Sequence, residues 1–348
     1  MGNINLMVTG GCGFIGSNFI RHVIGQREVT KLVNLDCLTY AGHPENLSAV
    51  DANPIYRFEP VDLRSKAAVL RVMRDHAITH VVHLAAESHV DRSIAGPDDF
   101  IHTNVIGTFH LLEACRALWL GDGAVIKSPV GTRFLHVSTD EVFGSLGAEG
   151  LFTESTPYAP NSPYSASKAS SDLLVRSYHH TYGLPTLITN CSNNYGPYQF
   201  PEKLIPVVIQ CCLHGQPIPV YGDGQNVRDW LFVTDHCEAL WQVLRRGRVG
   251  EIYNIGGHNE WSNLDLVRRI CELVDELAPP ETRGMPPSTS LISFVKDRPG
   301  HDRRYAIDAR KIQRELGWAP AHTSETSLRE TVQWYLANQT WVKAVMKA

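Results

Sequence analysis

Two adjacent carboxylates, Asp140 and Glu141, follow an apolar stretch in the sequence FLHVSTDEVFGS, residues 134–145. Residues 134–137 read as a short buried strand, and such strands in an open α/β sheet end at the edge of a ligand crevice. Because burial makes charge costly, two carboxylates at such an edge indicate acid–base chemistry. The alternative is an ordinary acidic turn exposed to solvent, and residues elsewhere in the chain decide between the two.

A second candidate pair lies in the segment PYSASK, where Tyr164 and Lys168 have Y-x-x-x-K spacing. Residues four apart on a helix share a face, so the phenol and the ammonium group can point into one cleft. A phenol with its ordinary pKa of about 10 is a poor base at neutral pH, but a nearby cation lowers that pKa. The pair predicts a tyrosine base, with Lys168 also able to bind the ribose of a nicotinamide cofactor. On a surface helix, the same spacing is common by chance.

The segment VTGGCGFIGS has Gly10, Gly13 and Gly16 at G-x-x-G-x-x-G spacing, and Gly11 completes G-x-G-x-x-G. Between an expected strand and an expected helix, such glycines allow a tight turn and a close approach of the backbone to a pyrophosphate. Asp36 ends the next strand and can accept hydrogen bonds from both hydroxyls of the adenosine ribose. Its charge would repel a 2′-phosphate, so the sequence favours NAD over NADP.

Two later segments, VDL at 61–63 and LAAES at 84–88, also follow strands on the same crevice edge. We expect Asp62 to meet the adenine amino group. The small residues Ala85 and Ala86 would let the chain pass close to the cofactor.

The elements that position these residues alternate along the first half of the chain. Apolar strands followed by helices of 3.6-residue period predict a doubly wound, parallel Rossmann-type sheet covered on both faces, an α/β fold. Strands are expected at 4–10, 31–36, 80–86, 133–138 and 185–190, and helices at 14–25, 69–77, 97–118 and 162–183.

After residue 190 the content of proline and glycine rises and the strict alternation is lost. We therefore expect an NAD-binding domain at 1–190 and a smaller, mixed α/β, substrate-binding domain at 191–348. Segments near 225–260, such as 228–233 and 251–257, are expected to return to the first domain.

The composition excludes several classes of protein. A formal net charge of −4 argues against nucleic-acid binding, and no apolar run approaches the roughly 20 residues of a membrane span. The N-terminus lacks signal-peptide features, and the eight cysteines show no C-x-x-C spacing, which favours reduced thiols in a cytoplasmic protein. His76, His80 and His83 are the closest histidine cluster, but they straddle a helix end and a strand, so no metal site is expected.

The motifs together resemble the extended short-chain dehydrogenase/reductase superfamily, and within it the 4,6-dehydratases of nucleotide sugars. The resemblance covers nearly the whole chain. It rests on TGGCGFIGS, LAAESHVDRS, STDEVFG, YSASKA, TNCSNNYGPYQFPEKLIP and DRPGHDRRYAID. Two positions depart from the family pattern, with Phe143 in place of the commoner Tyr and His43 in place of the commoner Asn.

The resemblance implies a role for each catalytic residue. Thr139 would partner Tyr164, which takes the proton of the sugar C4 hydroxyl while NAD oxidises C4. Glu141 would remove the C5 proton, and Asp140 would protonate the departing C6 hydroxyl. Reduction at C6 then regenerates the cofactor and yields the 4-keto-6-deoxy sugar, so the acidic pair is read as catalytic. The implied substrate is dTDP-glucose, and the pathway is the synthesis of deoxysugars such as rhamnose.

The resemblance also implies two sets of binding residues. The cofactor set comprises Gly10, Gly13, Phe14, Ile15, Gly16, Asp36, Leu38, Thr39, Asp62, Leu63, Leu84, Ala85, Ala86, Ser88, Thr103, Tyr164, Lys168 and Asn194. The substrate set comprises Ser88, Thr139, Asn193, Lys203, Leu204, Pro219, Tyr221, Arg228, Asn263, Arg298 and His301.

Two alternatives stay open at this point. One is a 4,6-dehydratase that acts on a UDP- or CDP-linked sugar, because the pocket for the base cannot be read from the sequence. The other is an NAD-sensing regulatory protein, against which the complete set of catalytic residues argues. A homodimer joined by the helices at 98–118 and 164–182 is also expected, because the first of these is apolar on more than one face.

Overall fold

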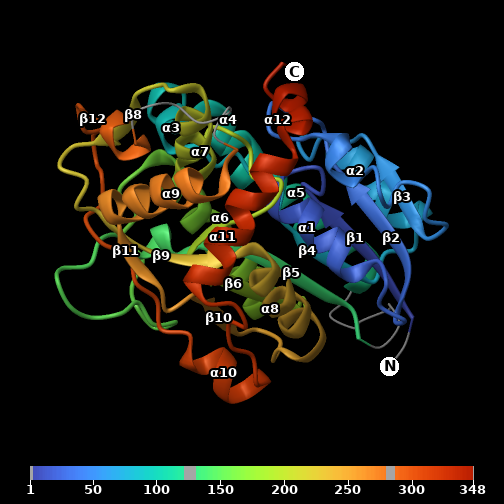
Figure 1. Ribbon diagram of the computed structural model, residues 1–348. Coiled ribbons are helices and arrows are strands. Elements are labelled where there is room, and N and C mark those ends of the chain that lie inside the picture. Colours follow the sequence, from blue (N-terminus) through green and yellow to red (C-terminus); the bar gives the residue numbers. More distant parts are fainter. Residues whose placement is uncertain (1–2, 121–130, 280–286, 348) are drawn as a thin grey trace.

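The computed structural model describes residues 3–120, 131–279 and 287–347, and its centre is a seven-stranded parallel sheet (Figure 1). The strand order is β10-β6-β5-β4-β1-β2-β3, so the chain winds outward from β1 in both directions. This confirms the predicted doubly wound fold, in which ligands bind where the winding reverses. The strands are β1 (Ile4–Thr9), β2 (Val29–Leu35), β3 (Tyr56–Glu59), β4 (His80–His83), β5 (Arg133–Thr139), β6 (Thr186–Cys191) and β10 (Ile252–Ile255).

Helices cover both faces of this sheet. On one face, α1, α8 and α10 pack apolar side chains against the strands, and on the other face α2, α5 and α6 do so. These six helices are α1 (Phe14–Val23), α2 (Lys66–Asp75), α5 (Thr108–Cys115), α6 (Pro163–Tyr182), α8 (Val233–Arg246) and α10 (Arg310–Leu316). Shorter elements are α3 (Val90–Ala95), α4 (Asp98–Phe100) and the 3-10 turns Pro44–Leu47, Asp140–Phe143 and Ser288–Leu291.

The helix α6 carries both Tyr164 and Lys168, and local sequence signals fix its two ends. Ser162 caps the N-terminus in a reciprocal capping box, and Pro163 occupies the first turn. Gly183 ends the helix with a φ of +70°, a left-handed conformation that favours glycine.

The helix predicted over 97–118 is present, but it is not uniform. Between α4 and α5 the turns at Ile101–Gly107 are π-helical, as are those at Arg116–Leu120. Such wider turns are rare and often lie at functional sites.

In the ranges that the structure describes, the second lobe has two small sheets and four helices that share a core. In the first sheet, β9 pairs in parallel with β7 and antiparallel with β11, and in the second β8 pairs in parallel with β12. The strands are β7 (Asn193–Tyr195), β8 (Ile218–Tyr221), β9 (Val227–Phe232), β11 (Glu260–Ser262) and β12 (Ile292–Val295). The helices are α7 (Leu204–His214), α9 (Asn263–Leu277), α11 (Ser324–Ala337) and α12 (Gln339–Val345).

The chain after residue 190 contributes to both parts of the molecule. As expected for 251–257, β10 joins the large sheet beside β6, and α8 and α10 also return to it. The segment 228–233 instead lies mostly in β9, within the small sheet. The domain boundary at residue 190 stays a prediction.

Cysteines and histidines take ordinary structural positions. All eight cysteines are free thiols. His76 lies 2.7 Å from a carboxylate oxygen of Glu59, and His80 contacts Thr79. His83 is buried and contacts the hydroxyl groups of Thr9 and Thr108. Over the described ranges, every helix is too short or too polar to cross a bilayer.

Candidate active site

A cleft of about 700 Å³ opens at the carboxyl ends of the large sheet and extends toward the second lobe. Most of the residues predicted for the cofactor and several predicted for the substrate line it. They are Gly10, Gly13, Phe14, Ile15, Gly16, Asp36, Thr39, Asp62, Leu63, Leu84, Ala85, Ala86, Ser88, Thr103, Thr139, Glu141, Tyr164, Lys168, Asn193, Asn194 and Lys203. Outside this lining lie Leu38, Asp140, Leu204, Pro219, Tyr221, Arg228, Asn263, Arg298 and His301.

The glycine loop between β1 and α1 is tightly packed on one side and open on the other. Gly10 has a φ of +69°, and a Cβ atom there would lie 2.7 Å from the backbone of Ala85. A Cβ atom on Gly16 would lie 2.1 Å from the carbonyl oxygen of Gly10. At Gly13 the same atom would meet only that carbonyl, at 3.3 Å, and Gly13 lines the cleft. A side chain at Gly13 would therefore fill the space in front of the N-terminus of α1, where a pyrophosphate fits.

Asp36, the residue after β2, is oriented by two backbone N–H groups. Its Oδ2 accepts from Cys12 and its Oδ1 from Leu38, both at 2.9 Å. Leu38 adopts a φ of +57°, which aims its N–H back at the carboxylate. Each oxygen keeps a lone pair for a further donor, as a ribose with two hydroxyls would supply.

Asp62 is already engaged by a neighbour. Its two carboxylate oxygens accept hydrogen bonds from the backbone N–H and the Nε of Arg64, each at 2.8 Å. The expected contact with an adenine amino group stays a prediction, and Oδ1 of Asp62 keeps a lone pair for such a donor.

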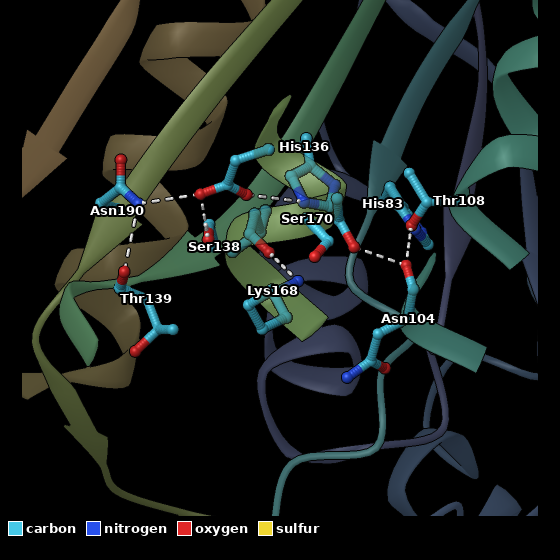
Figure 2. A network of polar contacts seen from close by, with 12 residues as sticks. His83, Asn104, Thr108, His136, Ser138, Thr139, Lys168, Ser170 and Asn190 are labelled. Carbon is cyan, nitrogen blue, oxygen red and sulfur yellow. Dashed lines mark hydrogen bonds and ion pairs between the residues drawn. The ribbon is translucent and has the colours of Figure 1, made fainter. Parts of the chain in front are cut away.

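The catalytic candidates meet where β5 ends. Thr139 is the last residue of β5, and its Oγ1 accepts from the N–H of Glu141 at 3.2 Å and donates to Asp140 Oδ1 at 3.3 Å. Tyr164, near the start of α6, lines the same cleft as Thr139. One turn along α6, Lys168 donates to the carbonyl oxygen of Val137 at 2.9 Å (Figure 2).

The two carboxylates have different surroundings. Burial raises the pKa of Asp140 well above its usual range, and the charges of Glu141 and Asp229 raise it further. Burial also raises the pKa of Glu141, but Arg228 and two other cations oppose that shift. Asp140 is only 1% exposed and its Oδ2 has no hydrogen-bond partner within the described residues. The surroundings of Asp140 therefore favour its protonated form. Of the two carboxylates, Glu141 is the one that lines the cleft.

Burial raises the pKa of Tyr164 well above its ordinary value, and the charge of Glu141 adds to the rise, while the hydrogen bond to Thr139 lowers it. This direction differs from the lowering expected from a neighbouring Lys168. The sequence shows the lysine, but it does not show that the phenol is only 9% exposed. A positive charge placed in the cleft would move the pKa of Tyr164 back toward neutrality.

A polar network that the sequence reading missed lies beneath these residues. Asp172 Oδ2 accepts hydrogen bonds from Ser138 at 2.8 Å, from Tyr158 at 3.0 Å and from Asn190 at 3.4 Å (Ser138 and Asn190 are labelled in Figure 2). The Nε2 of His136 lies 3.1 Å from Oδ1 without hydrogen-bond alignment. The sequence did contain one indication of this network. Asp172 lies four residues after Lys168 on the same helix, so the two side chains share a face.

The π-helical turn before α5 serves the same region. The side chain of Asn104 donates to the carbonyl oxygen of Glu87 at 3.0 Å and accepts from its N–H at 2.8 Å. It also donates to Ser167 of α6 at 2.8 Å, and its own carbonyl oxygen accepts from Thr108 at 2.5 Å. The wider turn therefore ties α6 to the loop that lines the cleft after β4.

The mouth of the cleft is crossed by a second cluster that was not predicted. The guanidinium of Arg92 lies 3.5 Å above the ring of Tyr40, whose hydroxyl donates to Glu202 at 3.0 Å. Glu202 also lies 3.7 Å from Arg92. These residues come from three separate segments, so no local spacing in the sequence could reveal them.

Two cationic residues that were predicted to bind the substrate belong to the second lobe. Arg228 on β9 is buried, stacks 4.1 Å above Tyr305 and donates to the carbonyl oxygen of Asp302 at 2.9 Å. Lys203 donates to the carbonyl oxygen of Ser88 at 3.3 Å.

A second group of predicted substrate residues gathers near β8. Arg298 lies 3.5 Å from Asp91 and 5.9 Å from the ring centroid of Tyr221, whose ring meets that of His301 at 6.4 Å. Pro219 lies in β8, and Leu204 and Asn263 begin α7 and α9.

The doubly wound sheet, the open glycine loop and the Thr–Tyr–Lys group define a short-chain dehydrogenase/reductase of the extended type. The family model described as GDP-mannose 4,6 dehydratase matches residues 7–331. The chain belongs to the family of the dTDP-glucose 4,6-dehydratases, as two curated relatives show. That of Neisseria meningitidis serogroup B is 57% identical over 98% of this chain and 96% of the relative. Enzyme 1 of Escherichia coli K12 is 53% identical, over 98% of this chain and 95% of the relative.

Solved structures agree with this assignment. The dTDP-glucose 4,6-dehydratase of Streptomyces venezuelae, solved with NAD bound, matches with a TM-score of 0.88 at 46% identity. The match covers 98% of this chain and 100% of that one. The Bacillus anthracis enzyme, also in complex with NAD, matches with a TM-score of 0.84 at 45% identity, over 98% of this chain and 99% of that one.

Proposed function

We propose that the protein binds NAD and dehydrates dTDP-glucose to dTDP-4-keto-6-deoxyglucose. The observation that carries this proposal is the acidic pair at the end of β5, beside Thr139 and Tyr164. Oxidation and reduction at one carbon need only the tyrosine, whereas loss of water across C5 and C6 needs a further base and a further acid. Asp140 and Glu141 supply them, and the relatives are enzymes with this activity.

The cofactor site fits NAD on the chemistry of its donors. The open space before Gly13 and the N-terminus of α1 suits the pyrophosphate, and the oriented carboxylate of Asp36 suits an unmodified ribose. When bound, NAD accepts the C4 hydrogen with its electron pair and later returns it to C6. The remaining cofactor residues keep the roles predicted above.

Tyr164 takes the proton of the C4 hydroxyl in the first step. A hydrogen bond from the hydroxyl of Thr139 would stabilise the ionised phenol, and the ammonium of Lys168 is held by the carbonyl oxygen of Val137. Burial lowers the pKa of Lys168, and the charge of Asp172 opposes that shift.

Glu141 acts after C4 has become a ketone. A ketone at C4 acidifies the hydrogen at C5, because the carbanion left behind becomes an enolate. Glu141 removes this proton, and Asp140 protonates the C6 hydroxyl as it leaves. The environments of the two carboxylates support these opposite protonation states. Among nearby cations, Arg228 opposes the rise in the pKa of Asp140, whereas Arg228, Arg298 and Lys203 all oppose the rise in the pKa of Glu141.

The diphosphate next to the sugar is held by cations from the second lobe. Arg228, Arg298 and Lys203 all exert their charge on Glu141, so they lie near the sugar end of the cleft. Guanidinium groups offer forked donors that suit a diphosphate. The other substrate residues named from the sequence keep their predicted roles, and the comparisons favour a dTDP sugar over a UDP- or CDP-linked one.

Two further expectations belong to this proposal. The exposed apolar side chains Ile101, Ile106, Leu173 and Tyr182 lie on the two helical segments expected to join a homodimer. A cytoplasmic location and a role in deoxysugar synthesis, such as that of rhamnose, also remain predictions.

A panel of nucleotide sugars tests the proposal. The purified protein is incubated with dTDP-, UDP-, CDP- and GDP-linked hexoses, and the 4-keto product is read by its ultraviolet absorbance in alkali. We expect product from dTDP-glucose, and far less from a Tyr164→Phe variant assayed in parallel. Product from another nucleotide sugar in preference to dTDP-glucose would contradict the proposal.

A further inference from the structure

Two segments that flank the glycine loop meet each other at the mouth of the cleft. In the large sheet β1 lies between β2 and β4, and all three strands are parallel, so the segments that follow them leave the same sheet edge. Tyr40 follows β2, and Arg92 lies on α3, after β4. The guanidinium of Arg92 nevertheless lies 3.5 Å from the ring centroid of Tyr40. This contact therefore spans the end of β1, where the glycine loop leaves space for a pyrophosphate.

Glu202, from the second lobe, completes the contact. Its carboxylate accepts a hydrogen bond from the hydroxyl of Tyr40 at 3.0 Å and lies 3.7 Å from the guanidinium of Arg92. The side chain of Glu202 is only 16% exposed, and the ring of Phe200 meets that of Tyr40 edge-on at 5.8 Å. Tyr40, Arg92 and Glu202 all line the cleft, and we call these three residues the clasp.

The clasp joins protein groups to one another. Each of the printed distances connects two side chains of the chain itself, and all three residues lie outside the sets predicted to bind cofactor or substrate. The segments that it joins do carry predicted cofactor residues, because Thr39 precedes Tyr40 and Ser88 lies shortly before α3. The position of the clasp thus suits a cover for the cofactor more than a direct ligand.

A dinucleotide in this cleft must pass beneath the clasp. The adenosine ribose is placed at Asp36, after β2, and the reacting end near Tyr164, beside β5, so the pyrophosphate between them lies in front of the glycine loop. The proposed reaction stores a hydride on the cofactor between the oxidation at C4 and the reduction at C6. Exit of the reduced cofactor between these steps would leave an oxidised sugar that the site cannot complete.

We propose, resting on the function assigned above, that the clasp covers the bound dinucleotide and sets the rate at which it leaves. The glycine loop supports the pyrophosphate from one side, and Tyr40, Arg92 and Glu202 close the other. The cofactor leaves when the guanidinium of Arg92 and the ring of Tyr40 part. These residues act by retention of the cofactor and take no part in the chemistry.

The test measures how fast the cofactor leaves the purified holoenzyme. Each protein is mixed with an excess of NAD that carries deuterium in its nicotinamide ring. Samples are desalted over time and denatured, and mass spectrometry gives the labelled share of the NAD that was bound. Arg92→Ala and Tyr40→Leu each remove the contact between guanidinium and ring, and the double variant is made as well. Tyr40→Phe keeps the ring and loses only the hydrogen bond to Glu202, in case Tyr40→Leu folds poorly.

Arg21→Ala is the matched control. The guanidinium of Arg21, on α1, lies 4.5 Å from the ring centroid of Tyr198, so this contact also joins the first part of the chain to the second lobe. Both residues lie outside the lining of the cleft.

We expect exchange to be about 5-fold faster in Arg92→Ala and in Tyr40→Leu, the change that loss of one half-exposed cation–π contact allows. Tyr40→Phe should give a smaller increase. The double variant should be no faster than the faster single variant, because both substitutions break the same contact. Arg21→Ala should exchange at the wild-type rate.

Exchange at the wild-type rate in Arg92→Ala and in both Tyr40 variants would overturn the clasp. So would effects that multiply in the double variant, since Arg92 and Tyr40 would then act on the cofactor independently. An equal acceleration in Arg21→Ala would show a general loosening of the protein and would also overturn it. These outcomes differ from failure of the proposed function, in which the wild-type protein itself would hold no nicotinamide dinucleotide.

Discussion

Asp140 and Glu141 are neighbours in the chain, yet their side chains meet different charges. Asp140 faces inward beside Asp229, and Glu141 faces the cleft near Arg228, Arg298 and Lys203. A pair of carboxylates separated in this way can hold and release protons at different moments of one reaction. Two predictions at the scale of single residues follow from that arrangement and from the open glycine loop.

Glu141→Gln should separate oxidation from dehydration. Tyr164 and Lys168 remain, so oxidation at C4 should still occur, but the C5 proton has no base. NADH absorbance should rise on addition of dTDP-glucose and decay slowly, and product should form about 10²–10⁴-fold more slowly. Tyr164→Phe is the control, and it should suppress the NADH signal itself. A Glu141→Gln protein that dehydrates at the wild-type rate would show the acidic pair to be only a turn.

Gly13→Val should abolish NAD binding without unfolding the protein. The added side chain meets little of the protein itself, because its Cβ has only the carbonyl oxygen of Gly10 within 4 Å, at 3.3 Å. It would instead fill the space proposed for the pyrophosphate. We expect wild-type protein to release NAD when denatured. The variant should release none and still unfold cooperatively, at a lower temperature because bound NAD no longer stabilises it. Gly25→Val, with no atom within 4 Å of its Cβ, is the matched control. NAD retained by Gly13→Val would place the pyrophosphate elsewhere.

At the scale of elements, the ends of α6 could be predicted and the π-helical turns could not. Ser162, Pro163 and Gly183 are local signals, readable from the sequence. The turn at Ile101–Gly107 depends on Asn104, which bonds to a loop 17 residues away and to α6, 63 residues away. No periodicity within the segment contains that information.

The residues of the candidate site also fall into those that the sequence could predict and those that it could not. The glycine loop and the Tyr164–Lys168 pair are set by short spacings and were found. The pKa direction of Tyr164 was expected wrongly, because burial depends on elements that pack from elsewhere. Glu202 and Arg92 were missed because their contacts join distant segments.

Asp172 links α6 to the strands beneath it and should make stability depend on pH. Burial raises its pKa from 3.8 to about 6, although Lys168 and three hydrogen bonds oppose the rise. Because the folded state binds this proton more tightly than the unfolded chain, the contribution to stability is complete below pH 3.8 and is lost as the pH rises through about 6. His136 and Tyr158 are its other titratable neighbours.

Asp172→Asn should therefore flatten part of the pH profile of unfolding. Between about pH 5 and about pH 7, wild type should lose about 1 kcal/mol more of its free energy of unfolding than the variant does. Urea titrations of both proteins at the two pH values measure this difference. If the two proteins change in parallel, Asp172 is already ionised at both pH values.

At the scale of the whole molecule, the prediction concerns the apolar surface through which two subunits would associate. Leu173 on α6 and Phe294 on β12 are both 58% exposed, but only Leu173 lies on the surface expected to join two subunits. Leu173→Glu should shift the protein from dimer to monomer at micromolar concentration, because it would bury a charge in an apolar interface. Phe294→Glu should leave the dimer intact. Light scattering decides, and wild-type protein that is monomeric at this concentration would refute the dimer.

The central claim is that one molecule of sugar is oxidised at C4, dehydrated and reduced at C6 within a single site. The most direct measurement uses dTDP-glucose that carries deuterium at C4, with the product analysed by NMR. The account predicts that the deuterium appears in the C6 methyl group of the same molecule, with none transferred between labelled and unlabelled sugars in a mixture. Product with an unlabelled methyl group, or with its label lost to water, would contradict it.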